Sequence, residues 1–358
     1  MAWAELVVDR IVATGFIRPA VLWRGLQHCR PSPSRWGVSA LISLSGLLVE
    51  PLAWMQSLLF TQRLQRVQLP DDPIVVIGHW RSGTTYLHQL LACDPTVATA
   101  RNTLTVAPQV ALLLKPWIAP LLKAWMTRVR PIDAVPWGPD DPQEDELGLA
   151  RLTFDTNMGG MAFPRDYLAN FRRHVLVTTR AYERQWLTFC RLTCLHDGAG
   201  KSQWVIKNPV HTARVRLVLK HFPRARFVVL RRSPVDSIRS LVQVKQRLGA
   251  LVGLQPVPDP CTQVEETVMA HRELLDAFET SRHLIPDQQL LELDYDDLIH
   301  QPLQSFEGLY THFGLTSWPD ARGPIEARID QAGTYVADPV RLPLQAEHRL
   351  QSLMEESV

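Results

Sequence analysis

The sequence of 358 residues has little excess charge of either sign. Its formal net charge is +2 and its pI is about 8.3, which falls short of the basic excess expected of a general nucleic-acid binder. We therefore expect no nucleic-acid partner, and any anion must be recognised by a local cluster of basic residues. Because 46% of the residues are hydrophobic, the chain can still bury a sizeable core.

Cysteine is also scarce, and no two of the five cysteines form a C-x-x-C pair. Cys190 and Cys194 lie one helical turn apart, but a zinc site needs two more ligands and none is suitably spaced. The chain shows no obvious secretory signal. We interpret the thiols as buried side chains of a cytoplasmic protein, and we expect no metal.

Residues 1–70 form an apolar segment with helical patterns. Its centre, residues 38–60, is long enough to cross a bilayer, but Glu50 and Pro51 lie in the middle. A charge and a helix breaker there predict two shorter helices. These helices either pack on the rest of the protein or make a peripheral contact with a membrane, and both alternatives stay open.

After Pro70, short β-rich runs are each followed by a helical pattern, which predicts an α/β domain over 71–320 with a central parallel sheet flanked by helices. The expected strands are 73–78, 203–207, 225–230 and 289–294. The expected helices after the first three begin near Gly83, Pro209 and Pro234. We interpret 95–200 as a helical insertion on the substrate side and 321–358 as a C-terminal extension.

The first strand leads into "VIGHWRSGTTY" (76–86), which lacks the lysine of a phosphate-binding Walker A loop. Gly78 and Gly83 keep the glycine spacing of that motif, but Thr84 stands where the lysine belongs. Nucleotide hydrolysis and phosphoryl transfer depend on this lysine and on Mg²⁺. Arg81 supplies charge instead, and a guanidinium suits a tetrahedral oxyanion. The loop therefore favours transfer of a group that carries less charge than a phosphoryl group and needs no metal.

Two further junctions between a strand and a helix share one pattern. In 207–209 and 232–234 a basic residue is followed by Asn or Ser, which can cap a helix, and by Pro, which suits its first position. A cation beside a helix N-terminus suits an anion at the carboxyl edge of the sheet. Together with the loop, these junctions predict a ligand with two separated anionic ends.

These segments resemble the sulfotransferases that use 3′-phosphoadenosine 5′-phosphosulfate (PAPS), and more closely the bacterial group with an R-S-G-T-T loop. The resemblance covers roughly residues 70–315 and is carried by the blocks 73–95, 130–146, 204–240 and 291–302. It implies a P-loop-like sulfotransferase fold. It also implies transfer of a sulfuryl group from PAPS to a hydroxyl acceptor, with release of adenosine 3′,5′-bisphosphate and without a metal.

The resemblance also implies roles for single residues. The 5′-phosphosulfate would be cradled by Arg81, Ser82, Gly83, Thr84 and Thr85. Tyr86 would lie against the adenine, and Arg232 and Ser240, eight residues apart, would hold the 3′-phosphate. Lys207 and Arg81 would stabilise charge at the reacting centre.

One candidate for the general base is His211, four residues after Lys207. The match is approximate, because the cytosolic members of the family have K-x-H at this strand end. A histidine in the first turn of a helix stays neutral near pH 7, as a base requires. A histidine that only caps or packs there is the alternative.

The other candidate is a carboxylate of the acidic run 140–146, namely Glu144, Asp145 or Glu146. Related branches use a glutamate some 20 residues after the loop, but this chain has no carboxylate in 99–105. The structural alternative is a helix start in which Asp141 is the cap, Pro142 is the first residue and Glu144 completes a capping box. The choice between the histidine and a carboxylate stays open.

The tryptophans of the insertion, Trp117, Trp125 and Trp137, favour a lipid-like or aromatic alcohol as the acceptor, although core packing explains many such residues. Two other functions remain as alternatives. One is a degenerate P-loop kinase or NTPase, which would bind Mg·ATP. The other is a non-catalytic nucleotide-binding protein that associates with a membrane.

Overall fold

The computed structural model describes residues 14–126, 130, 137–333 and 340–356. At its centre lies a five-stranded sheet of order β2-β3-β1-β4-β5, in which all neighbours are parallel. The strands are β1 (Ile74–Gly78), β2 (Val97–Thr99), β3 (Gln203–Lys207), β4 (Arg226–Arg231) and β5 (Leu290–Asp294). The four predicted strands are confirmed to within one residue. Strand β2 has only three residues, too few for a recognisable pattern.

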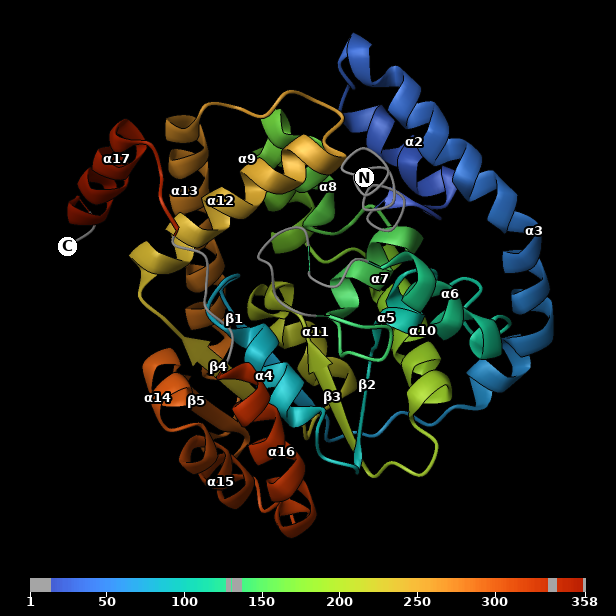
Figure 1. Ribbon diagram of the computed structural model, residues 1–358, viewed down its shortest axis with the longest axis vertical. Helices are drawn as coiled ribbons and strands as arrows, with labels where there is room; N and C mark the ends of the chain where they lie inside the picture. The colour runs from blue at the N-terminus through green and yellow to red at the C-terminus, as the bar shows by residue number, and fades with distance from the viewer. Residues whose placement is uncertain (1–13, 127–129, 131–136, 334–339, 357–358) are drawn as a thin grey trace.

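Both faces of the sheet are covered by helices. Alternate side chains of a strand point to opposite faces, and here both sets are apolar and must be buried. Val75 and Ile77 pack in the core on one face, beside helices α10 (Arg180–Asp197) and α11 (Val215–His221). Ile74 and Val76 pack on the other face, beside α4 (Thr84–Leu91), α15 (Pro302–His312) and α16 (Trp318–Ala332) (Figure 1). The predicted layered α/β architecture is therefore confirmed.

Three connections leave the carboxyl edge of the central strands. Helix α4 after β1 and helix α12 (Pro234–Val252) after β4 begin where predicted. After β3 a helix begins at Pro209 as predicted, but Pro209–Ala213 is the 3₁₀ helix η4, and the α-helix α11 begins only at Val215. The Asn208 side chain accepts from the Val210 N–H, and the Thr212 hydroxyl bonds to Gly78. These side-chain bonds compete with α-helical geometry.

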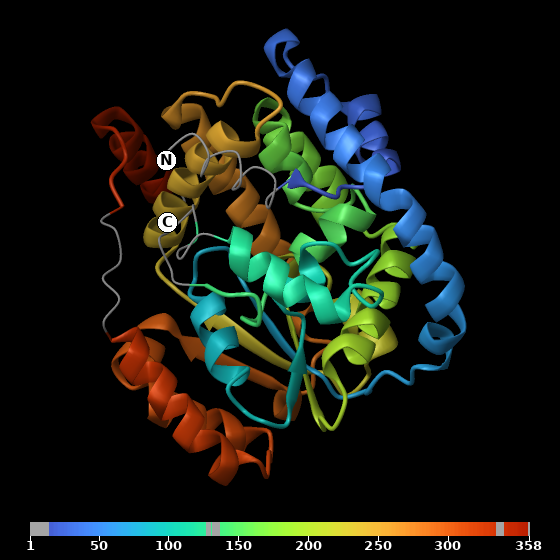
Figure 2. The ribbon, with the colours of Figure 1, turned by 45° about the vertical axis from the view of Figure 1, so that its right-hand side comes forward.

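The N-terminal part contains α2 (Pro19–His28), η1 (Pro33–Arg35) and α3 (Trp36–Arg66), and α3 runs along one edge of the molecule (Figure 2). The prediction of two short helices is wrong, because α3 is continuous through Pro51. An internal proline costs about 3 kcal/mol. Packing offsets this cost: Ile42 and Ala53 are buried, and the Gln56 side chain bonds to Pro108 and Leu112.

The insertion is mostly helical, as predicted. Its elements are α5 (Asn102–Thr105), α6 (Lys115–Trp125), α7 (Asp145–Leu152), α8 (Met158–Ala162), η2 (Pro164–Asp166), α9 (Tyr167–Phe171) and η3 (Arg172–Leu176), which are followed by α10. Residues 127–129 and 131–136 of the predicted insertion lie outside the described residues. The remaining elements are α13 (Pro260–Arg282), η5 (Asp287–Gln289), α14 (Tyr295–His300) and α17 (Leu344–Glu355). Ala346 and Leu350 of α17 pack against α12 and α13.

Candidate active site

The loop between β1 and α4 has three residues with positive φ: Gly78 at 140°, Arg81 at 68° and Gly83 at 96°. A Cβ atom at Gly78 would lie 2.6 Å from the Leu230 carbonyl oxygen, and one at Gly83 would lie 2.6 Å from the Tyr295 ring. Both positions therefore require glycine for conformation and for space. The glycine spacing seen in the sequence is what lets this loop curl tightly at the carboxyl edge of the central strand.

Arg81, Arg232 and Ser240 come together at this loop. The Arg81 Nε donates to the Ser240 Oγ at 3.0 Å, and the Arg232 Nη1 donates to the Arg81 carbonyl oxygen at 2.8 Å. Ser240 is buried on α12, two turns after the strand end that carries Arg232. The resemblance assigns Arg81 to one end of the donor and Arg232 and Ser240 to the other, whereas these two bonds bring the three residues into direct contact at the edge of the sheet.

Tyr295, which follows β5, also belongs to this cluster and was not anticipated from the sequence. Its ring lies under the Arg232 guanidinium, 4.2 Å from the guanidinium carbon to the ring centroid, and against Gly83. A cation over an aromatic face is held in orientation. The available signal was its position at the start of α14, directly after a predicted strand, because that places it at the same edge of the sheet.

The remaining residues of the loop differ in exposure. Ser82 is buried, and its hydroxyl donates to the His79 carbonyl oxygen at 2.8 Å. Thr84 and Thr85 begin α4 and line a cavity beside the loop. Tyr86 is half-buried and packs against the core on the α4 face. Its predicted contact with adenine stays a prediction.

Lys207 at the end of β3 pairs with Glu144. Its Nζ lies 2.8 Å from the Glu144 Oε2 and 3.4 Å from the Thr85 Oγ1. The side chain of Lys207 is 3% exposed and that of Glu144 is 18% exposed. A buried ammonium is strongly destabilised without a counter-charge. Glu144 therefore stabilises the folded position of Lys207, and the pair also places an acid and a base at one point of the site.

The capping-box interpretation of the acidic run is wrong. Helix α7 begins at Asp145, and Glu144 occupies the N-cap position without accepting a hydrogen bond from the helix. The Asp141 Oδ2 accepts from the Gly138 N–H. Lys207 attracts the Glu144 carboxylate toward the sheet edge, and a local reading of the sequence has no means to detect that distant partner.

The other two carboxylates of the run point elsewhere. The Asp145 Oδ2 accepts from the Trp186 Nε1 at 3.2 Å and lies 3.2 Å from the His211 Nε2, and both Asp145 and His211 are buried. Glu146 accepts from the Asn208 Nδ2 at 2.8 Å. Burial raises the pKa of Glu146 to about 7.

The cavity beside Lys207 has a charged end and an apolar body. Arg81, Thr85, Glu144 and Lys207 line the charged end, and Glu146 also contributes to the wall. The apolar body is formed by α6, α8, α12 and the residue after α6, through Leu122, Met126, Met161, Val244, Leu248 and Val252. His211 and Asp145 do not line this cavity. The arrangement can hold an apolar molecule with its polar end at the Lys207–Glu144 pair.

Among the predicted tryptophans, Trp137 lines the cavity and Trp117 is exposed on α6. The side chain of Trp125 lies outside the described residues.

Two similar proteins are omega-hydroxy-beta-dihydromenaquinone-9 sulfotransferases named Stf3, one from Mycobacterium bovis and one from Mycobacterium tuberculosis. Each is 28% identical to this chain over 308 residues, which are 85% of this chain and 77% of the relative.

Two solved structures are similar in fold. Sulfotransferase STF9 from Mycobacterium avium has a TM-score of 0.68 at 16% identity and covers 95% of this chain and 90% of its own. Sulfotransferase STF1 from Mycobacterium tuberculosis H37Rv has a TM-score of 0.65 at 16% identity and covers 98% of both chains.

The profile described as "Sulfotransferase family" matches residues 73–320, a range that begins just before β1 and contains the loop, Lys207, Arg232 and Ser240. With the sheet order and the loop geometry in place, this match makes the chain a member of the sulfotransferase family, an enzyme that transfers a sulfuryl group.

Proposed function

We propose that this sulfotransferase takes the sulfuryl group of PAPS and transfers it to the hydroxyl of an apolar, lipid-like acceptor. One observation carries the proposal. The Lys207 ammonium lies between the Thr85 hydroxyl of the loop and the Glu144 carboxylate, at the charged end of a mostly apolar cavity.

The residues at the sheet edge suit a donor with two anionic ends. Positive φ angles at Gly78, Arg81 and Gly83 curl the loop, and the backbone N–H groups of such a loop can face an anion. Arg81, Arg232 and Ser240 supply guanidinium and hydroxyl donors, which suit phosphate and sulfate oxygens. PAPS would supply the activated sulfuryl group, and these residues would hold its charged ends.

We assign the general base to Glu144. Its carboxylate lines the cavity and would accept the proton of the acceptor hydroxyl as the new bond from oxygen to sulfur forms. Lys207 would stabilise the negative charge left on the phosphate when the bond from sulfur to the leaving oxygen breaks. His211 is less suitable because its Nε2 faces Asp145 in a fully buried place, away from the cavity wall.

The acceptor class is supported by two independent observations. The body of the cavity is lined by Leu, Val and Met side chains, which favour apolar ligands over a sugar. In addition, the Stf3 relatives are named for an omega-hydroxylated menaquinone derivative, which combines a hydroxyl with a lipid-like chain.

The direct test incubates the purified full chain with radiolabelled PAPS and, separately, a prenylated quinone with a terminal hydroxyl or a monosaccharide. We expect label in the lipid product and none in the sugar, without added Mg²⁺. Adenosine 3′,5′-bisphosphate should raise the melting temperature in the absence of Mg²⁺. Stabilisation by Mg·ATP alone would contradict the proposed donor, and sulfation of the sugar alone would contradict the proposed acceptor.

A further inference from the structure

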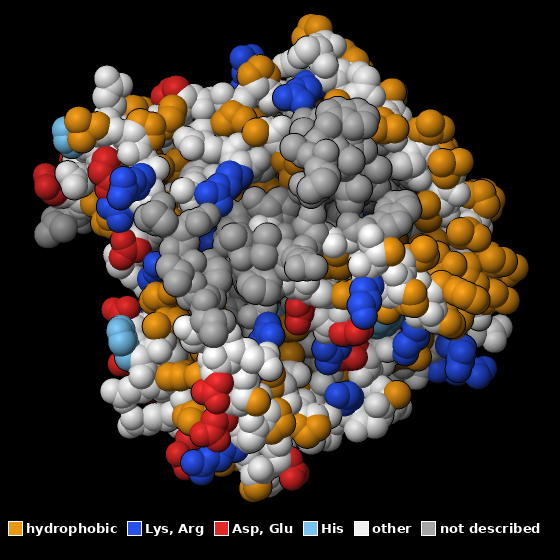
Figure 3. All heavy atoms as spheres, in the orientation of Figure 1, with side chains coloured by type: hydrophobic (Ala, Val, Ile, Leu, Met, Phe, Trp, Pro, Cys, Tyr) orange, Lys and Arg blue, Asp and Glu red, His pale blue; other side chains and the backbone are white. Residues whose placement is uncertain are grey.

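The outer face of α3 exposes a continuous row of large apolar side chains. Leu48, Trp54 and Leu58 are 71%, 72% and 83% exposed. The other exposed members are Trp36, Leu41, Leu44, Leu47, Met55 and Leu59. Their spacing of three and four residues places most of them on one side of the helix. The space-filling view shows hydrophobic side chains gathered at the edge of the molecule where α3 runs (Figure 3). A patch of this kind marks an interaction surface.

The inner face of α3 is fastened to the rest of the protein by polar contacts. The Gln56 Nε2 donates to the Pro108 carbonyl oxygen at 2.9 Å, and the Gln56 Oε1 accepts from the Leu112 N–H at 2.8 Å. Glu50 pairs with Arg18 at 2.8 Å. Among the described residues, α3 lies in the one helix long and apolar enough to cross a membrane. These contacts, however, hold it along the domain, so that only its outer face is available to lipid.

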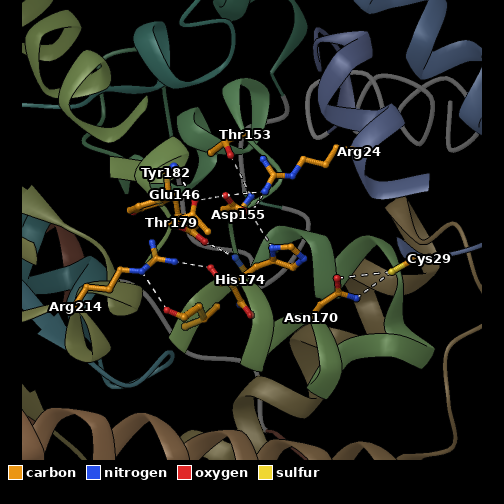
Figure 4. A network of polar contacts seen from close by, with 12 residues as sticks. Arg24, Cys29, Glu146, Thr153, Asp155, Asn170, His174, Thr179, Tyr182 and Arg214 are labelled. Carbon is orange, nitrogen blue, oxygen red and sulfur yellow. Dashed lines mark hydrogen bonds and ion pairs between the residues drawn. The ribbon is translucent and has the colours of Figure 1, made fainter. Parts of the chain in front are cut away.

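Helix α2 adds a second attachment. Arg24 of α2 pairs with the buried Asp155 at 3.1 Å, and Asp155 also lies 2.8 Å from both the His174 Nδ1 and the Thr179 Oγ1 (Figure 4). The N-terminal helices are therefore packed in a fixed position against the rest of the protein. A surface carried by them has a defined orientation relative to the active site.

The charge carried by the N-terminal helices is mostly basic. In residues 14–70, Glu50 is the one carboxylate of the sequence, and it is already paired with Arg18. Arg63 and Arg66 are exposed at the end of α3, and Lys123 is exposed on α6. Basic side chains beside an apolar face suit a membrane with anionic headgroups, because lipid tails accept the leucines and phosphates attract the cations.

Helix α6 connects this face with the cavity. Ala53 of α3 and Ile118 and Leu122 of α6 belong to one apolar cluster, and Leu122 also lines the cavity. On the outside, α6 exposes Trp117 and Leu121 at 67% and 52%. One helix therefore lies between the exposed apolar side chains and the place where the acceptor would bind.

We propose that the outer face of α3, together with Trp117 and Leu121 of α6, docks this enzyme on the surface of an anionic membrane. The enzyme lies on the membrane and does not cross it. The docked face brings the cavity close to the bilayer, so that an apolar acceptor enters without passing through water. This last step rests on the proposed function, whereas docking itself does not.

The test is sedimentation of the purified full chain with vesicles of phosphatidylcholine alone or mixed with phosphatidylglycerol. We expect binding to the anionic vesicles, weakened by salt. Leu48→Glu should lower the partition coefficient about tenfold. Leu344→Glu on α17 is the matched control, because Leu344 is also 71% exposed, and it should bind as the unchanged protein does.

Equal binding of Leu48→Glu and the unchanged protein, or equal loss in both variants, would overturn the proposal. So would light scattering that shows a dimer dissociated by Leu48→Glu together with no vesicle binding, because the face would then join two copies of the chain. Sedimentation needs neither donor nor acceptor, so vesicle binding without any sulfated product would contradict the proposed function alone. Leu48→Glu should slow transfer to an acceptor in vesicles and leave transfer to the detergent-solubilised acceptor unchanged.

Discussion

Two pairs of a carboxylate and a basic side chain lie at the start of α7, Glu144 with Lys207 and Asp145 with His211. Only the first pair lines the cavity. Glu144 pairs with Lys207 at the cavity wall, whereas Asp145, the next residue, faces His211 in a fully buried place beside Trp186. The backbone of Glu144 is extended and that of Asp145 is already helical. This change of conformation sends two consecutive carboxylates to opposite environments. The first pair has the exposure that a catalytic base needs, and the second has the burial of a structural contact.

The largest effect should come from Glu144→Gln. The amide keeps the shape of the side chain but cannot accept the acceptor proton, so we expect kcat to fall by about 10²–10⁴-fold. The measurement is the initial rate with saturating donor and acceptor. His211→Gln is the comparison variant and should keep kcat within about threefold of the unchanged protein. If His211→Gln loses the activity with its fold intact and Glu144→Gln retains it, the two pairs have the opposite roles.

Lys207→Met should reduce kcat by about 10²–10³-fold, since one preorganised cation at the leaving oxygen is lost. The substitution also leaves Glu144 without its partner, so the melting temperature of the variant must be followed in parallel. Adenosine 3′,5′-bisphosphate should still stabilise the variant, because Arg81, Arg232 and Ser240 are untouched. A normal kcat in this variant would remove Lys207 from the reaction.

Arg232→Ala should act on donor binding and leave the chemical step largely intact. Loss of one charge-assisted contact weakens binding by about 1.5–3 kcal/mol, or roughly 10–100-fold in the KM for PAPS. Adenosine 5′-phosphosulfate is a donor that lacks the 3′-phosphate. The KM for this donor should therefore differ much less between the variant and the unchanged protein than the KM for PAPS does. An equal loss with both donors would show that Arg232 does not recognise the 3′-phosphate.

Glu146→Gln should have the smallest effect on activity and a clear effect on the pH dependence of stability. Burial raises the pKa of Glu146 from 4.5 to about 7, so between these values the folded protein binds a proton that the unfolded chain has lost. The contribution of Glu146 to the free energy of unfolding is therefore complete below about pH 4.5 and is lost as the pH rises through 7. Denaturant unfolding measures the free energy of unfolding at pH 5 and pH 8. This free energy should fall less between the two pH values in the variant than in the unchanged protein, by up to about 3 kcal/mol. Parallel curves would contradict the raised pKa.

Much of the donor side of the site could be predicted from the sequence. Gly78 and Gly83 are set by local backbone conformation, and Lys207 and Arg232 end apolar runs that read clearly as strands. Parallel strands bring their carboxyl ends to one edge, so these side chains had to meet once the strands were identified. Ser240 follows by helical periodicity from the same strand end.

Other features depended on partners far away in the chain. Pro51 lies inside a continuous helix because Ala53 and Gln56 pack against the insertion. The segment after Lys207 became a 3₁₀ helix, with Thr212 bonded to Gly78 of the loop. The local pattern around Glu144 indicated a capping box, and no role could be given to Tyr295 although it lies in the resembling block 291–302.

By itself, then, the sequence determined four of the five strands, the glycine loop and the cations at the strand ends, because these follow from periodicity and backbone conformation over a few residues. Only the tertiary structure decided which carboxylate reaches Lys207, that His211 lies behind the cavity wall, and that α3 keeps an apolar face toward solvent. Each of these depends on which distant surface packs against the residue, and burial and pairing energies of several kcal/mol outweigh the smaller local preferences of the chain.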